Sequence, residues 1–224
     1  MYKIEKYLDL EDFPFMEVFE NIDQAWEVLG DYLKEFCSKF KENKIEGTVM
    51  EGAHLEGEGI WIGEGTVVEP GAYIKGPTVI GKNCEIRHSA YIRGNVVVGD
   101  NCVVGHCTEV KGSIFLNGAK AGHFAYVGDS ILGKNVNLGA GTKLANLKII
   151  DAPIVLNMAG NRLDTGLRKM GAILGNNVEI GCNAVTSPGT VLPPDSLIYP
   201  AIAIKGCFEK RTILRTTNMV KSSK

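Results

Sequence analysis

The chain lacks several features that would place it in a common functional class. Its 24 basic and 26 acidic residues leave a formal net charge of −2, whereas a general nucleic-acid binder needs a basic face. No run approaches the about 20 consecutive apolar residues that span a membrane. The N-terminal stretch MYKIEKYLDLEDFPF is charged throughout, without the apolar core of a signal peptide. We therefore expect a cytoplasmic protein that binds neither nucleic acid nor membrane.

The cysteines also lack the spacing of a metal or redox motif. None of the six cysteines forms a C-x-x-C pair, so the pattern does not indicate a zinc ribbon or a thioredoxin-like site. In a reducing cytosol, we expect the central residues Cys84 and Cys102 to be buried packing residues rather than disulfide partners or metal ligands.

What the chain does have is an aliphatic residue at every sixth position through its middle. The anchors of this repeat are Ile62, Val68, Ile74, Ile80, Ile86, Ile92, Val98, Val104, Val110 and Leu116. Neither an amphipathic helix nor an alternating strand keeps this period, whereas a hexapeptide repeat is typical of a parallel β-helix. Three hexads close one triangular coil, so residues about 18 apart in sequence become neighbours about 5 Å apart. We therefore predict an all-β chain built as a parallel β-helix.

The parts of the chain outside the regular repeat predict a simple domain organisation. Apolar residues with helical spacing predict a helix over residues 22–41, within an N-terminal helical extension at 1–45. The β-helix occupies residues 46–206, and an inserted loop at 147–172 interrupts it, with a candidate β-hairpin through IIDAPIVL. Residues 207–224 form a C-terminal tail. Just past the regular repeat some rungs shorten to five residues, and such irregular stretches often mark functional positions.

Counting in steps of 18 places three cations in one column. Lys75, Arg93 and Lys111 each follow an anchor directly, at 18-residue steps. Three like charges in a row repel one another, and a phosphate bridging them would relieve that repulsion. The alternative is a solvated face on which Glu69 and Glu109 compensate the charge. Spacing alone leaves both interpretations open.

A second column contains three histidines. His88, His106 and His123 each stand two places after an anchor, at steps of 18 and 17 residues. Stacked imidazoles bind zinc in γ-class carbonic anhydrase, which has a similar coil, but the close histidine pair of that family is absent here. One histidine acting as a general base is favoured over a metal site, because its pKa lies near the working pH.

Several motifs together resemble one family of enzymes. Residues 121–142, AGHFAYVGDSILGKNVNLGAGT, and the ANLK at 145–148 resemble the acetyltransferase domain of bifunctional glucosamine-1-phosphate acetyltransferase/N-acetylglucosamine-1-phosphate uridyltransferases. The TGLRKMGAILG at 165–175 is most similar to the archaeal-type sugar-1-phosphate nucleotidyltransferases, and the resemblance covers about residues 60–205. It implies a left-handed parallel β-helix, an exception to the right-handed crossover rule. It also implies a homotrimer, with active sites between subunits, that uses acetyl-CoA.

The resemblance implies roles for individual residues. His123 matches the general base that takes a proton from the sugar amine, and a backbone amide in the Gly139–Gly141 turn is a candidate oxyanion donor. The residues matched to substrate binding are Arg93, Lys111, Tyr126, Asn137, Asn146 and Lys169. The residues matched to the acetyl-CoA channel are Ala140, Cys182 and Pro200.

These roles predict an N-acetyltransferase that moves acetyl from acetyl-CoA to the amine of glucosamine or galactosamine 1-phosphate. The sequence departs from the family at Leu147, where the better-known bacterial enzymes have tyrosine. It also has no G-x-G-T-R loop, and residues 1–45 are too few for a uridyltransferase domain, so we expect the chain not to make a nucleotide sugar alone. The alternatives are a non-catalytic or regulatory β-helix subunit that partners a separate sugar nucleotidyltransferase, and a metal-dependent γ-carbonic-anhydrase-like protein.

Overall fold

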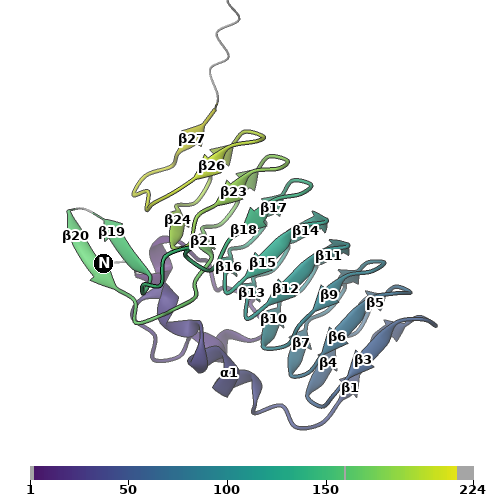
Figure 1. Ribbon diagram of the computed structural model, residues 1–224. Coiled ribbons are helices and arrows are strands. Elements are labelled where there is room, and N and C mark those ends of the chain that lie inside the picture. Colours follow the sequence, from purple (N-terminus) through teal and green to yellow (C-terminus); the bar gives the residue numbers. More distant parts are fainter. Residues whose placement is uncertain (1–2, 159, 216–224) are drawn as a thin grey trace, which may run out of the picture.

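The computed structural model describes residues 3–158 and 160–215, and three parallel sheets dominate it (Figure 1). Sheet 1 consists of β1 (Lys44–Ile45), β4 (Ile60–Ile62), β7 (Thr78–Ile80), β10 (Val96–Val98), β13 (Ile114–Phe115), β16 (Ile131–Leu132), β21 (Ala172–Leu174) and β24 (Thr190–Leu192). Sheet 2 consists of β2 (Thr48–Val49), β5 (Val67–Val68), β8 (Glu85–Ile86), β11 (Val103–His106), β14 (Lys120–His123), β17 (Asn137–Leu138), β22 (Glu179–Ile180), β25 (Leu197–Ile198) and β27 (Ile213–Leu214). Sheet 3 consists of β3 (His54–Glu56), β6 (Tyr73–Lys75), β9 (Tyr91–Ile92), β12 (Glu109–Lys111), β15 (Tyr126–Gly128), β18 (Lys143–Leu144), β23 (Val185–Thr186) and β26 (Ala203–Ile204).

In the β-helix, each strand pairs in parallel with the strand three places along the chain until the insertion adds two strands. The pairing partners are 18 residues apart in the regular part, as Trp61 with Val79 and Val79 with Val97 show. One coil therefore contributes one strand to each sheet. The predicted all-β, left-handed parallel β-helix of hexapeptide repeats is confirmed.

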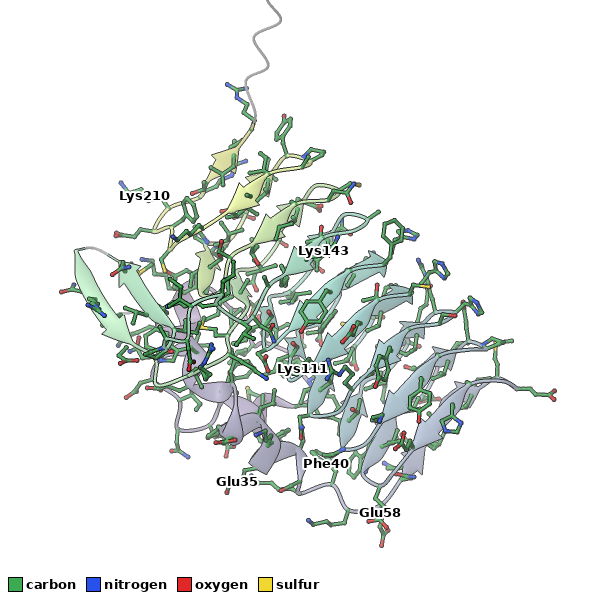
Figure 2. The ribbon with its side chains drawn as sticks, in the orientation of Figure 1. Glu35, Phe40, Glu58, Lys111, Lys143 and Lys210 are labelled. Carbon is green, nitrogen blue, oxygen red and sulfur yellow. The ribbon has the colours of Figure 1, made fainter. Side chains whose placement is uncertain are left out.

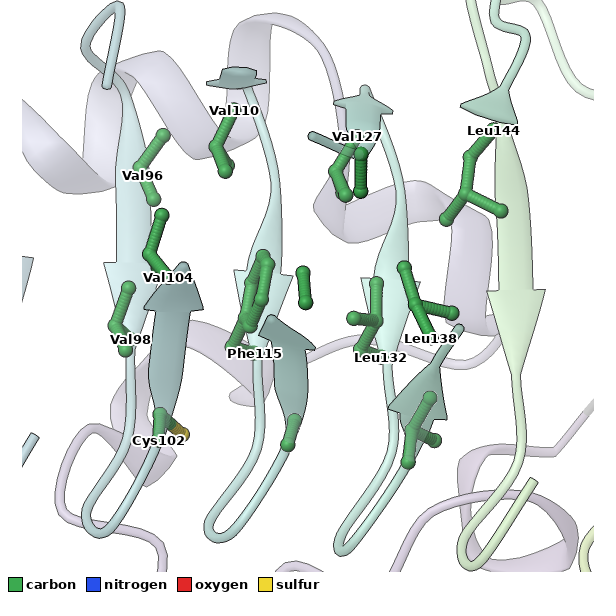
Figure 3. Packing of buried hydrophobic residues seen from close by; sticks show 14 of the residues in the cluster. Val96, Val98, Cys102, Val104, Val110, Phe115, Val127, Leu132, Leu138 and Leu144 are labelled. Carbon is green, nitrogen blue, oxygen red and sulfur yellow. The ribbon is translucent and has the colours of Figure 1, made fainter. Parts of the chain in front are cut away.

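The repeat anchors from Ile62 to Val110 form a continuous core along the axis of the coil (Figure 3). The predicted anchor Leu116 is wrong, because the rung after Val110 is five residues long: Phe115 pairs with Val98 and enters the core, whereas Leu116 packs with the N-terminal region. Because residues of the core stack on their counterparts in the next coil, each coil is stabilised mainly by its two neighbours. Cys84 and Cys102 are buried free thiols within it, as predicted.

The N-terminal region covers the outer face of sheet 1. It contains three 3₁₀ turns, η1 (Ile4–Lys6), η2 (Met16–Phe19) and η3 (Ala25–Val28), and one α-helix, α1 (Asp31–Cys37). Its apolar side chains bury the outward-facing residues Val79 and Val97. The single helix predicted over 22–41 is wrong, because Gly30 adopts a left-handed φ of 68° and separates η3 from α1. Within the described ranges, no helix is long and apolar enough to cross a bilayer.

The insertion forms an antiparallel hairpin of β19 (Val155–Met158) and β20 (Asn161–Asp164). The hairpin predicted through IIDAPIVL is therefore wrong in position, since only the last two residues of that stretch belong to β19. Leu156 is fully buried, and the Tyr7 hydroxyl donates to the Met158 sulfur at 3.8 Å. These contacts fix the hairpin beside the N-terminal region (Figure 1).

The C-terminal tail continues the coil for one more strand. β27 pairs with β25, joining Leu197 to Ile213 and Ile198 to Leu214. The rest of the predicted tail, residues 216–224, lies outside the described residues.

Candidate functional site

One corner of the coil, between sheets 2 and 3, carries the predicted base and the predicted coenzyme residues together. Strand register aligns the residues that stand three places after the first residue of each sheet 2 strand, and His106 pairs directly with His123. The members of this corner column are His88, His106, His123, Ala140, Cys182 and Pro200. The imidazoles of His88 and His106 stack at 5.7 Å between centroids, with 9° between their planes. The predicted histidine column is therefore confirmed.

The histidines of the column differ in how they are held. His88 places Nδ1 2.6 Å from the Pro70 carbonyl oxygen, and His106 places Nδ1 3.2 Å from the His88 carbonyl oxygen. In the described part of the chain, neither ring nitrogen of the exposed His123 has a hydrogen-bond partner. Among the histidines of the column, His123 is therefore the one whose ring nitrogens are both open to a ligand.

The backbone at this corner is strained beside His123. Phe124 has a φ of 34°, in a region that bulky side chains rarely adopt, yet its side chain is 52% exposed. Its ring lies 3.3 Å from the position that a Cβ on Gly141 would take. Such outliers persist where the surrounding structure enforces them, and they often occur at functional sites.

The predicted cation column lies on sheet 3, with Lys111 on its outer surface (Figure 2). Each of its members has a carboxylate partner. The ion pairs are Lys75–Glu56 at 3.4 Å, Arg93–Glu109 at 2.8 Å and Lys111–Asp129 at 2.9 Å. The hydrogen bond from Arg93 to Glu109 raises the pKa of Arg93. Since each of these three charges is compensated, repulsion among Lys75, Arg93 and Lys111 does not by itself require a bound anion.

The compensation differs in part from the predicted one. Glu109 pairs with the column as expected. Glu69 does not, because its carboxylate accepts a hydrogen bond from the His88 amide at 2.7 Å. The other two carboxylates that pair with the column are Glu56, on β3, and Asp129, the residue after β15.

A buried polar cluster continues from the cation column. Lys111 donates to both oxygens of Asp129, at 3.0 and 2.9 Å, and the Asn146 amide also donates to the Asp129 carboxylate. The Tyr126 hydroxyl donates to Asn146 Oδ1 at 3.3 Å. Burial, followed by the Asp129 charge, raises the pKa of Tyr126, so the phenol stays neutral. The cluster joins two donors, Lys111 and Asn146, to the acceptor Asp129 at the carboxyl ends of β12, β15 and β18.

Gly128 makes room for this cluster. It occupies the next position of the cation column, paired with Lys111. A Cβ at Gly128 would lie 2.7 Å from both the Tyr126 hydroxyl oxygen and Asn146 Nδ2. The hydrogen bond between these two side chains therefore depends on the missing side chain at Gly128.

The other predicted substrate residues lie on different elements. Lys169 is exposed. The next residue, Met170, donates its backbone amide to the Asn146 carbonyl at 3.0 Å and so holds this segment against the cluster. Asn137 lies apart on sheet 2, where its amide donates to Glu179 at 2.9 Å. Within the described residues, no hydrogen bond joins the cluster to His123. One chain therefore presents two separate groups of predicted site residues.

Sequence reasoning missed Asp129, the carboxylate at the centre of the cluster. It stands two places past an anchor with a left-handed φ of 45°, at a corner where spacing alone gives no signal of ion pairing. The dipeptide Gly-Asp is an ordinary turn signal, so its second role appears only in three dimensions. Among the described residues, no group of three histidine, cysteine or acidic side chains lies close enough to hold a metal ion.

Comparison with known proteins identifies similar chains. The family model described as the GMPPB C-terminal domain matches residues 74–199. The bifunctional sugar-1-phosphate nucleotidylyltransferase/acetyltransferase of Sulfurisphaera tokodaii is 37% identical over 91 residues, which are 41% of this chain and 23% of that protein. The predicted resemblance to this class of proteins is thereby confirmed.

Two further similarities extend over more of the chain. The bifunctional protein GlmU of Methanococcus maripaludis (strain DSM 14266) is 38% identical over 183 residues, which are 80% of this chain and 43% of that protein. A solved UDP-N-acetylglucosamine acyltransferase from Campylobacter jejuni is 18% identical with a TM-score of 0.42, covering 71% of this chain and 66% of that one. The chain thus spans less than half the length of the Sulfurisphaera tokodaii and Methanococcus maripaludis proteins that it matches.

Proposed function

This chain belongs to the family of the GMPPB C-terminal domain, and from its similarity to a sugar-1-phosphate nucleotidylyltransferase/acetyltransferase we propose that it is an acetyl-CoA-dependent N-acetyltransferase. Its proposed acceptor is the amine of an amino-sugar 1-phosphate, glucosamine or galactosamine 1-phosphate. The name of this similar protein supports acetyl transfer in the metabolism of sugar phosphates. The observation that carries the proposal is the corner column, which aligns the open imidazole of His123 with Ala140, Cys182 and Pro200.

The proposed chemistry needs a base and an oxyanion donor. The amine nitrogen of the sugar attacks the thioester carbonyl, and His123 takes a proton from that amine. The tetrahedral intermediate then breaks its carbon–sulfur bond, and the proton held by His123 passes to the departing coenzyme sulfur. Direct attack requires no covalent intermediate on the protein.

Ala140 is the proposed oxyanion donor within the Gly139–Gly141 turn. The Gly139 amide already donates to the Ile180 carbonyl at 2.6 Å, and the Gly141 amide donates to the His123 carbonyl at 3.0 Å. The Ala140 amide has no acceptor in the described part of the chain. It lies one coil beyond His123 in the same column, so base and donor are neighbours.

The separation of the two groups of site residues supports a homotrimer as the working unit. His123 and the cluster of Lys111, Tyr126 and Asn146 lie on different faces of one chain, without a connecting contact in the described ranges. In the proposed trimer, the corner column of one subunit faces the cluster of another. The sugar phosphate would then meet Arg93, Lys111 and Lys169 while its amine meets the base.

A thiol-release assay tests the proposal. Acetyl-CoA is offered with a panel of free and 1-phosphorylated amino sugars, and coenzyme release is followed with a chromogenic disulfide. We expect His123→Ala to lower kcat by about 10²–10⁴-fold, the usual contribution of a general base. His88→Ala is the matched control, since it removes a histidine from the same column. Unchanged turnover in His123→Ala with the oligomer intact would refute the assignment.

A second candidate function is a non-catalytic or regulatory subunit of a separate sugar nucleotidyltransferase. The ion pairs on Arg93 and Lys111 favour it, because a sugar phosphate would have to compete with Glu109 and Asp129 for these cations. This candidate predicts no thiol release with any amino sugar, together with a change in the kcat of the nucleotidyltransferase when the purified chain is added.

A further inference from the structure

Three basic side chains from separate segments line one cavity between the hairpin and the last coils. The cavity has a volume of about 450 Å³. Lys148 comes from the start of the insertion, Arg162 from β20, and Lys205 from the residue after β26. We name this cavity the hairpin pocket. The proposed acetyl transfer uses none of these three cations.

The charge in the hairpin pocket is not compensated as it is at Lys75, Arg93 and Lys111. No carboxylate lines the pocket among the described residues. Lys148 donates to the Pro153 carbonyl at 2.6 Å, which holds the first turn of the insertion in place. Within the described ranges, neither Arg162 nor Lys205 forms an ion pair.

Strand register makes the contrast sharper. Lys205 belongs to the same column as Lys111, separated from it by the small residues Gly128, Ala145 and Ser187. Lys111 is bound to its carboxylate, whereas Lys205 faces a cavity that contains two further cations. The uncompensated end of the column is therefore the end that the hairpin covers.

The hairpin pocket has the chemistry of a phosphate site, and we propose that it binds the phosphate or diphosphate group of a small-molecule ligand. An anion relieves the repulsion among the three cations, and a guanidinium such as that of Arg162 binds phosphate oxygens in pairs. The Gly206 amide lines the pocket and has no acceptor in the described part of the chain. Val155 and Pro188 add apolar walls against which the remainder of a ligand packs.

Titration calorimetry at low salt tests this site without any turnover. The probes are inorganic pyrophosphate, coenzyme A, dephospho-coenzyme A and glucosamine 1-phosphate, each added alone. We expect Arg162→Gln and Lys205→Gln each to weaken binding of at least one of these probes about tenfold or more, since each substitution removes a charge-assisted hydrogen bond to phosphate. Lys41→Gln, which removes an exposed cation outside the pocket, is the matched control and should bind as the unmodified chain does.

The probes distinguish the sources of the phosphate. A variant effect on coenzyme A that disappears with dephospho-coenzyme A assigns the pocket to the ribose phosphate of the coenzyme. An effect on glucosamine 1-phosphate assigns it to the sugar, and an effect on pyrophosphate shared by both coenzyme forms assigns it to a diphosphate. Each of these results supports the site.

Two results overturn it. One is the absence of binding by every probe at millimolar concentration, and the other is equal binding by the pocket variants and Lys41→Gln. The circular dichroism spectrum of each variant verifies that it is folded. His123→Ala leaves the pocket unchanged and should bind inorganic pyrophosphate as before, so failure of the proposed acetyl transfer and failure of the hairpin pocket are separate outcomes.

Discussion

Replacing Gly128 with alanine tests whether the polar cluster depends on a missing side chain. The new Cβ would lie 2.7 Å from the Tyr126 hydroxyl oxygen and from Asn146 Nδ2, closer than the 3.0 Å below which something must shift. Asn146 is 9% exposed and bound to Asp129, so it has little freedom to move away. Overpacking costs about 1–3 kcal/mol, and loss of the tyrosine–asparagine hydrogen bond adds about 1 kcal/mol. We expect the free energy of unfolding to fall by about 2–4 kcal/mol.

Gly122 supplies the matched control for this experiment. Like Gly128 it lies in a strand of the β-helix, but the nearest atom to an added Cβ is Arg87 Nη1 at 4.0 Å. We expect Gly122→Ala to change stability by less than about 0.5 kcal/mol, as surface substitutions usually do. Urea unfolding at neutral pH, followed by circular dichroism, gives both values.

A second background isolates the cause. Tyr126→Phe removes one of the two atoms that the new Cβ would meet, so Gly128→Ala should cost less there, with a coupling of about 0.5–3 kcal/mol. The reasoning fails if Gly128→Ala is as stable as Gly122→Ala, or if its cost is the same in both backgrounds.

Two further predictions concern strain and burial. Phe124→Asn should stabilise the fold by about 1 kcal/mol, because asparagine tolerates the left-handed φ of 34° better than phenylalanine; a lower melting temperature would count against strain at this corner. Burial raises the pKa of Tyr7 from 10.0, and that of Cys37 from 9.0, to about 12 in each case, so the neutral forms stabilise the fold. The contribution of these two groups to the free energy of unfolding should be constant below pH 9 and fall as the pH rises from there towards 12. Urea unfolding at a series of pH values checks this, Tyr7→Phe should make the fall shallower, and equal stability at about pH 8 and about pH 11 would contradict it.

The features that follow from periodicity were predictable from the sequence. The six-residue spacing of the anchors determines which side chains enter the core from Ile62 to Val110, and the 18-residue step determines which lie in one column. Spacing alone was therefore enough to align Lys75, Arg93 and Lys111, and to align His88 with His106.

The features that depend on lateral contacts were not predictable. Asp129 pairs with Lys111 on the adjacent coil, and the sequence contains several other acidic residues at similar separations along the chain from Lys111. Gly30 divides the predicted helix because its backbone is left-handed, whereas the apolar spacing around it continues without a break. The hairpin lies later than predicted because Leu156 is buried against the N-terminal region, a contact between segments that are far apart in the sequence.

The N-terminal region has a consequence for how the molecule comes apart. In a stack whose coils contact only their neighbours, stability is a sum of local terms, and unfolding can begin at an end and proceed coil by coil. Here the first residues reach along the stack: Asn117 donates to the Asp12 carbonyl at 2.8 Å, and Asn176 donates to the Tyr7 carbonyl at 3.0 Å. Losing a middle coil therefore also releases the segment that covers the others. Such a brace converts a one-dimensional array into a single cooperative unit.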